Sequence, residues 1–216
     1  TYGADAIRWY FYTNSAPWLP NRFYGKAVVE GQRKFMGTLW NTYAFWVLYA
    51  DIDSFDPTKY SLKDCTLTVM DRFILSRLNT TVAETDDHLA NYRIPEAAKS
   101  LSTFVDELSN WYVRRCRERF WGKDMTEDKI AAFMTLYTCL VTIAKASAPM
   151  IPFMAEDIYQ SLVRTVDENA PESIHLCDYP ESDMSFIDRQ LETDMDFILR
   201  VVVLGRSARN GSNIKN

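Results

Sequence analysis

Hydrophobic residues along this chain recur mostly at three- and four-residue steps, which is the spacing of one face of an α-helix. Prolines interrupt this pattern and divide the chain into Pro-free stretches. The clearest stretch is Leu67–Tyr92. Another begins at Pro95, which suits a first helical turn, and runs to about Trp121, where Gly122 suits a helix end. Further helices are predicted over residues 21–50, 126–148, 153–166 and 185–204.

Strand-type alternation is scarce. Ser173–Cys177 is the one segment that we predict to be extended. No period of about 20–50 residues recurs, so the pattern gives no indication of a solenoid. Long helices with short, proline-marked connections predict an all-α fold, an antiparallel helical bundle.

The composition supports a folded core. Apolar residues make up 47% of the 216 positions, which excludes disordered and fibrous chains. The longest uncharged run, Phe35–Ala50, is shorter than the roughly 20 residues of a membrane span and is predicted to be a buried helix. The opening Thr1–Asp5 lacks the basic and apolar order of a signal peptide, and we expect no membrane association.

Cysteine and histidine spacing argues against a metal site. The four cysteines contain no Cys-x-x-Cys pair, and the two histidines, His88 and His175, lie far apart. We therefore expect no metal and a reducing, cytoplasmic compartment.

The charge is unevenly distributed. The net charge is -5. Residues 150–204 carry the acidic excess, residues 1–149 are close to neutral, and the only charged side chains in residues 205–216 are basic. A polyanion would be repelled by the acidic block, so nucleic-acid binding would need a local basic patch on another surface.

No enzyme signature is present in the sequence. It lacks a Gly-rich phosphate loop, a Gly-x-Ser-x-Gly elbow and a His-Glu-x-x-His motif. Acidic pairs such as Asp86-Asp87 are typical of solvated helix faces. The residues therefore predict a binding module without catalytic residues.

The most unusual segment is Asp106–Trp121, which combines arginines with aromatic residues. A helical wheel places Trp111 and Tyr112 on the inner face, where they would act as structural anchors. Arg115 and Arg119 continue that apolar stripe, so they must leave the core or meet carboxylates, because an unpaired buried guanidinium is costly.

Four residues of this segment form an outer row on the opposite face of the wheel: Asn110, Arg114, Arg117 and Trp121. Two arginines beside an aromatic and an amide suit phosphate contact and base stacking. A plainer alternative is a solvated basic face with Trp121 tucked under the next loop. The basic stretch Gly205–Asn210 is a further observation relevant to the choice between a nucleic-acid contact and a solvated face.

Several motifs in one order carry a family resemblance. They are Tyr2–Tyr10, Lys34-Phe35 with Leu39–Asn41, Asp71–Asn79, Asp106–Trp121, Ala148–Tyr159 and Leu204–Asn210. Together they resemble the anticodon-binding region of isoleucyl-tRNA synthetases, a family of class I aminoacyl-tRNA synthetases. At two positions where the family pattern leads us to expect tryptophan, this sequence has other aromatic residues, Phe73 and Tyr179. Both exchanges are conservative. Asp106–Trp121 is the most specific motif for the isoleucine branch.

The resemblance implies a fragment with a recognition role. The parent enzyme would join isoleucine to its tRNA using ATP and magnesium, whereas this part lacks the His-Ile-Gly-His and Lys-Met-Ser-Lys-Ser signatures and needs no cofactor. Its partners would be the anticodon stem and loop of isoleucine tRNA and the catalytic domain of the same chain. The tRNA-binding residues implied are the outer row together with Arg115 and Arg119.

The implied organisation has three parts. Residues 1–22 would be a linker after the catalytic domain, residues 23–180 the helical bundle, and residues 181–216 a C-terminal helix with a truncated basic end. Trp9, Phe11 and Trp18 would be exposed surface that the catalytic domain covers.

Two alternatives remain open from the residues. The chain could be the same module of a sister synthetase, most plausibly the valine enzyme. It could also be a helical interaction domain whose basic row binds an acidic partner other than RNA.

Overall fold

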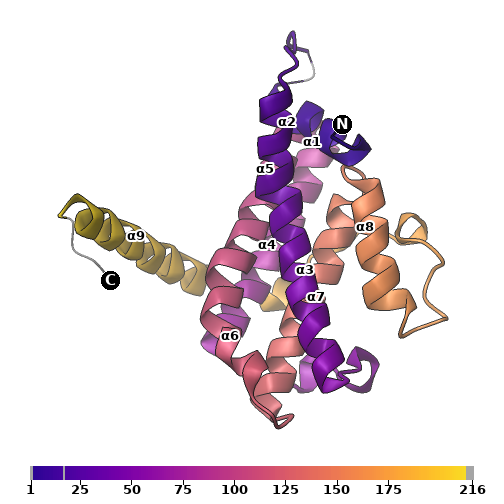
Figure 1. Cartoon of the computed structure of the whole chain (residues 1–216), viewed down its shortest axis with the longest axis vertical. Coiled ribbons are helices and arrows are strands. Elements are labelled where there is room, and N and C mark those ends of the chain that lie inside the picture. Colours follow the sequence, from indigo (N-terminus) through magenta and orange to yellow (C-terminus); the bar gives the residue numbers. More distant parts are fainter. Residues whose placement is uncertain (1, 17, 213–216) are drawn as a thin grey trace.

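The computed structural model describes residues 2–16 and 18–212, so residues 1 and 17 of the 1–22 segment and residues 213–216 of the 181–216 segment lie outside the described residues. Every regular element in the described part is helical, which confirms the predicted all-α bundle. Figure 1 shows most of the helices side by side, with the C-terminal helix pointing away from them.

Two long helical rods are each interrupted by a π-helical segment. The first rod consists of α2 (Gly25–Gly31), the π segment η1 (Gln32–Gly37) and α3 (Thr38–Asp53). The second consists of α5 (Ile94–Glu107), the π segment η4 (Leu108–Val113) and α6 (Arg114–Trp121). The rods match the helices predicted from residue 21 and from Pro95. The apolar run in the first rod is only partly buried, because Trp40 and Leu48 on α3 face outward.

The other α-helices are α1 (Ala4–Asn14), α4 (Val69–Ala90), α7 (Glu127–Ser147), α8 (Pro152–Tyr159) and α9 (Arg189–Gly211). A π segment, Gln160–Arg164, continues α8. Short 3-10 turns lie at Pro57–Lys59, Leu62–Asp64, Ile174–Leu176 and Met184–Phe186.

The prediction of an extended piece at Ser173–Cys177 is wrong, because this segment forms the 3-10 turn Ile174–Leu176. The Ser173 hydroxyl accepts a hydrogen bond from the His175 backbone N–H at 3.2 Å. The Glu156 carboxylate accepts from the Ile174 N–H at 2.9 Å. These side chains satisfy the backbone locally, so no partner strand is needed.

Aromatic side chains join the helices into one core. Trp46 on α3 donates a hydrogen bond from Nε1 to the Phe133 carbonyl of α7 at 3.0 Å. Phe133 also packs edge to face with Phe120 at the end of the second rod, with ring centroids 5.0 Å apart. Buried aromatic contacts of this kind hold the two rods against α7.

Helix α1 packs into the bundle through Trp9. The Trp9 ring stacks on Phe35 with centroids 3.7 Å apart, and only 3% of Trp9 is exposed. The expectation that Trp9 is open surface is therefore wrong, since the indole fills a space against the first rod. Phe11 and Trp18 are exposed, as expected.

The base of α9 is fixed by a buried polar cluster. The Glu192 carboxylate accepts hydrogen bonds from Ser76 Oγ at 2.6 Å and Thr80 Oγ1 at 2.7 Å on α4. Arg77 forms ion pairs with Glu107, Glu192 and Asp196. Beyond Met195 the helix has no buried residue, and it continues to Gly211, seven positions past the predicted end at Leu204. Its outer half projects from the bundle (Figure 1).

Among the described residues, one helix, α7, is long and apolar enough to cross a membrane by length and composition. Of the apolar 18-residue stretch in α7 that meets this test, 67% is buried inside the bundle. Core position accounts for the apolar composition of α7.

Candidate nucleic-acid interface

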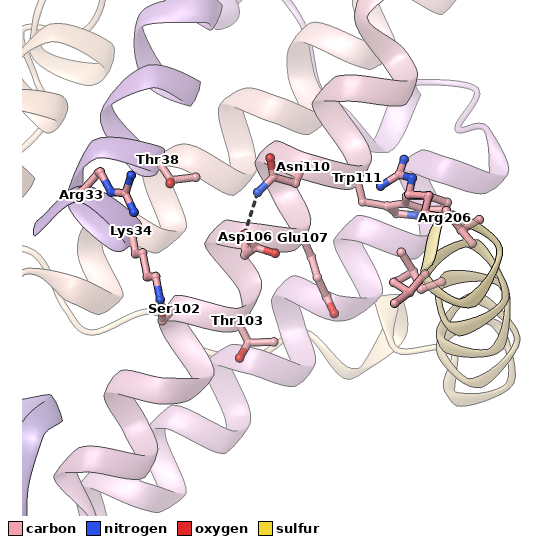
Figure 2. Close-up of a pocket in the computed structure, with 13 residues that line it drawn as sticks. Arg33, Lys34, Thr38, Ser102, Thr103, Asp106, Glu107, Asn110, Trp111 and Arg206 are labelled. Carbon is pink, nitrogen blue, oxygen red and sulfur yellow. Dashed lines mark hydrogen bonds between the residues drawn. The ribbon is translucent and has the colours of Figure 1, made fainter. Parts of the chain in front are cut away.

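A groove lies between the first rod, the second rod and α9, with a volume of about 870 Å³. The first rod contributes Arg33, Lys34 and Thr38. The second rod runs along the floor, and α9 supplies Leu199, Val202, Val203 and Arg206 (Figure 2). No single helix therefore makes this groove.

Cations stand on both rims of the groove. Arg33 and Lys34 lie on the η1 side, and Arg206 lies on the α9 side (Figure 2). Lys34 also pairs with Glu30 at 2.7 Å, but both side chains are more than half exposed, so the pair is weak. A second cavity of about 500 Å³ shares Arg206 and adds Arg114, Arg209 and Asn210. The basic surface thus extends along α9 beyond the main groove.

The floor of the groove carries hydroxyls and carboxylates. Ser102, Thr103, Asp106 and Glu107 come from α5, and Asn110 follows on η4. Asn110 Nδ2 donates to Asp106 Oδ1 at 2.6 Å, the contact drawn in Figure 2. Burial raises the pKa of Glu107 to about 7, against the opposing effect of Arg77. The groove therefore combines a basic rim with a floor rich in hydrogen-bond acceptors.

Both π segments of the two rods face this groove. Arg33 and Lys34 lie on η1, whereas Asn110 and Trp111 lie on η4. π-helical segments are rare and often occur at functional sites, because an extra residue in a turn changes where the side chains point. Their coincidence on opposite sides of one groove marks it as the candidate site.

All four residues of the predicted outer row are exposed. They do not all line the same cavity, however. Asn110 lines the main groove and Arg114 the second cavity. The Arg117 guanidinium lies 5.9 Å from the centre of the Phe45 ring on the first rod, and Trp121 is half exposed at the end of α6.

Arg115 has left the core, which was the first of the two predicted outcomes, although the wheel placed it on the apolar stripe. The side chain is exposed, and its guanidinium carbon lies 4.7 Å from the centre of the Trp111 ring. Cys116 and Phe120 occupy the buried positions instead. The π segment adds a residue to one turn, and every position after it is rotated relative to an ideal α-helix.

Arg119 meets carboxylates, which was one of the two predicted outcomes. Nη1 and Nη2 donate to Asp71 Oδ1 and Oδ2 at 2.8 and 2.9 Å, and Nε donates to Asp128 Oδ2 at 2.9 Å. Burial lowers the pKa of Arg119, but the hydrogen bonds to Asp71 and Asp128 raise it above its ordinary value. All three guanidinium nitrogens of Arg119 donate to carboxylates of the same chain, Asp71 and Asp128. This geometry favours a role for Arg119 in stabilising the fold.

Asp71 connects the start of α4 to the second rod. It closes a capping box with Thr68 and accepts from the Tyr112 hydroxyl at 2.6 Å. Burial alone would raise the pKa of Asp71, yet hydrogen bonds from Arg119, Tyr112 and Thr68 bring it below its usual range. Tyr112 is fully buried, which confirms its predicted place on the inner face.

Trp111 is also buried, as predicted, with 8% of its surface exposed. It nevertheless lines the groove, and its indole Nε1–H finds no acceptor among the described residues. An unpaired buried donor is unusual in a folded protein and indicates a place where a ligand could supply the acceptor.

Sequence reasoning missed three groove cations: Arg33, Lys34 and Arg206. Lys34 belonged to a motif and Arg206 to the basic end, but neither was placed in the site. Only the packing of η1 and α9 on either side of the second rod brings them together. Among the described residues, no group of three His, Cys, Asp or Glu side chains could hold a metal ion.

The chain is a helical bundle with a cation-rimmed groove, which suits an anionic ligand, and comparison with known proteins gives the family. The model of the anticodon-binding domain of tRNA ligases matches residues 71–216. The chain belongs to this family.

Curated relatives extend the similarity to nearly the whole chain. It is 59% identical to an isoleucine–tRNA ligase of Clostridium novyi and 56% identical to that of Clostridium kluyveri, over 99% of its length in each case. An isoleucine–tRNA ligase 2 of Bacillus cereus is 45% identical over the same share. The chain spans only about a fifth of these relatives, 20% or 21% of each.

A solved structure supports the fold. A LeuRS–tRNA–LeuAMS ternary complex from Agrobacterium radiobacter matches with a TM-score of 0.63 at 13% identity, covering 87% of this chain and 20% of that one. At this identity the match bears on the fold alone, and it agrees with the predicted bundle type of class I synthetases.

Proposed function

We propose that this chain is the anticodon-binding part of an isoleucine–tRNA ligase and that it binds the anticodon stem and loop of isoleucine tRNA. The observation that carries the proposal is the groove with cations on both rims, in a chain similar along 99% of its length to isoleucine–tRNA ligases. Arginine and lysine hold phosphates, while single-stranded loop bases can unstack and enter a groove.

The contact residues that we propose extend the outer row. Arg114, Arg117 and Arg115 would hold phosphates, Trp121 would stack on a base, and Asn110 would contact a base edge. Arg33, Lys34 and Arg206 join them from the groove rims. The acidic charge of residues 150–204 helps to restrict the RNA to this surface by repelling it elsewhere.

The parent enzyme would attach isoleucine to its tRNA with ATP and magnesium, in the cytoplasm and without a membrane. This part would supply binding and orientation, and it would need no cofactor of its own. The catalytic domain of the same chain would lie on residues 1–22, where Phe11 and Trp18 are exposed. Residues 23–180 would form the binding bundle, with 181–216 as its C-terminal extension.

Relatives named for isoleucine favour this reading over the valine alternative. The alternative of a helical interaction domain for a non-RNA partner is disfavoured by the family match.

A binding titration tests the proposal. Isoleucine tRNA and valine tRNA are titrated against the chain with heparin present, which competes for generic polyanion affinity. We expect isoleucine tRNA to keep a measurable affinity and to bind more tightly than valine tRNA. Loss of all tRNA binding in heparin, or equal binding of the two tRNAs, would contradict the proposal.

A further inference from the structure

The floor of the groove has a chemistry that phosphate recognition does not explain. A phosphate group accepts hydrogen bonds and carries negative charge, so Asp106 and Glu107 would repel it. Glu107 is occupied by Arg77, with Nε 3.1 Å from its carboxylate oxygen Oε2. Asp106 forms no ion pair among the described residues, and the one side-chain hydrogen bond that it makes there comes from Asn110. Its second carboxylate oxygen has no hydrogen-bond partner among the described residues, and the groove that Asp106 lines is basic at the rims.

The hydrogen bond between Asn110 and Asp106 fixes which atoms are left for a ligand. An ionised carboxylate can only accept, so Asn110 must present its Nδ2 amide to Asp106. The Asn110 carbonyl oxygen is then directed elsewhere. Together Asp106 Oδ2 and Asn110 Oδ1 offer two acceptors at the groove floor, and a matching ligand must carry N–H or O–H donors.

Trp111 supplies a second, independent indication of a ligand. Trp111 lines the same groove, and its buried indole N–H has no acceptor among the residues that the structure describes. The ligand that completes this site would thus carry acceptors as well as donors. Nucleobases have both on their edges, whereas phosphate has no donor.

From these contacts, and resting on the proposed RNA-binding function, we propose that Asp106 and Asn110 read an unpaired guanine. Guanine presents two adjacent N–H donors, N1–H and the N2 amine, on the edge that an unpaired loop leaves open. Adenine and cytosine present one amine beside a ring nitrogen acceptor, which Asp106 would repel, and uracil presents a single imino N–H. Asp106 is in this sense a specificity-determining residue of the groove.

The direction in which one substitution changes RNA affinity distinguishes this proposal from simple charge repulsion. If Asp106 only repels RNA, Asp106→Asn removes a negative charge and strengthens binding to every RNA alike. If Asp106 accepts from guanine, the same substitution weakens binding to RNA with the guanine and leaves other RNA unchanged or slightly tighter. Glu118→Gln is the matched control, because Glu118 is an exposed carboxylate on the same rod that does not line the groove.

The experiment uses RNA hairpins that differ in one loop base, which is guanine, inosine, adenine, cytosine or uracil. Inosine keeps N1–H and lacks the N2 amine. We expect the unmodified protein to prefer guanine over inosine by about tenfold or more, the loss associated with one hydrogen bond to a charged group. Asp106→Asn should abolish this preference, and Glu118→Gln should retain it, with thermal unfolding checked for both variants.

Three results would overturn the inference. One is equal binding of all hairpins by the unmodified protein. Another is a uniform gain of affinity in Asp106→Asn. The third is a uniform loss, which would indicate contact with a ribose hydroxyl. Absence of binding to any hairpin and to isoleucine tRNA would instead refute the proposed function itself, so the two failures are distinguishable.

Discussion

The contact between Arg119 and Asp71 allows a quantitative prediction. Arg119→Met removes the guanidinium and keeps much of the side-chain volume, leaving Asp71 fully buried with only Tyr112 and Thr68 as donors. Breaking a buried ion pair on one side costs about 3–5 kcal/mol. Because 15% of the Arg119 side chain is exposed, we expect the lower end, about 3 kcal/mol. In a chain of this size that corresponds to a fall in melting temperature of about 6–12 °C.

The pH dependence of this variant follows from the pKa of Asp71. In the unmodified protein that pKa is lowered, so the stabilisation is present at neutral pH and is lost as the pH falls through the folded pKa. Without Arg119, burial dominates and the folded pKa of Asp71 should lie above its usual value of about 3.9. Acidification towards about pH 5 should then stabilise the variant, and the difference between the two proteins should narrow.

Urea unfolding followed by circular dichroism, at neutral pH and near pH 5, measures both free energies of unfolding. Arg117→Met is the control, because Arg117 is exposed and should change stability by less than about 0.5 kcal/mol. An Arg119→Met variant as stable as the control, or a difference that stays constant with pH, would refute the assignment of Arg119 to the fold.

The remaining predictions concern binding and catalysis. Arg114→Gln and Arg117→Gln should each reduce the salt slope of tRNA binding by about 0.7–0.9 per lost phosphate contact, measured by titration over a salt series. Lys63→Gln, at a residue that lines neither the groove nor the second cavity, should not. Trp121→Ala should weaken tRNA binding by about 1–3 kcal/mol with an unchanged melting temperature, and unaltered affinity would argue against stacking. The chain alone should give only background isoleucine-dependent exchange of pyrophosphate into ATP, and exchange that is lost on mutation of the chain would contradict a pure binding role.

The helices were predictable because hydrophobic spacing, proline and glycine act locally. Thr68 with Asp71 at the start of α4, and Pro95 at the start of α5, are signals contained in a few neighbouring residues. The inner positions of Trp111 and Tyr112 followed from the same periodicity.

The errors in the site come from two causes that the local pattern does not contain. A wheel at a constant angle cannot register the π segment η4, and it therefore assigned Arg115 to the stripe that Cys116 occupies. The groove itself depends on long-range packing, which brings Arg33 and Arg206 to opposite sides of the second rod. The burial of Trp9 is likewise decided by its distant partner, Phe35.

Helix α9 is held at its base, so a small change of tilt there moves its outer end by a larger distance. Its base is clamped at Glu192, and Arg206 lies about 21 Å further along the axis, from the rise of 1.5 Å per residue. A tilt of about 10° at the clamp would displace Arg206 by about 4 Å, more than the length of a hydrogen bond. Ser76, Arg77 and Thr80 therefore help to set the width of the groove, although they touch no part of its basic rim. Leu199 and Val202, which pack against the core, also hold α9 in place.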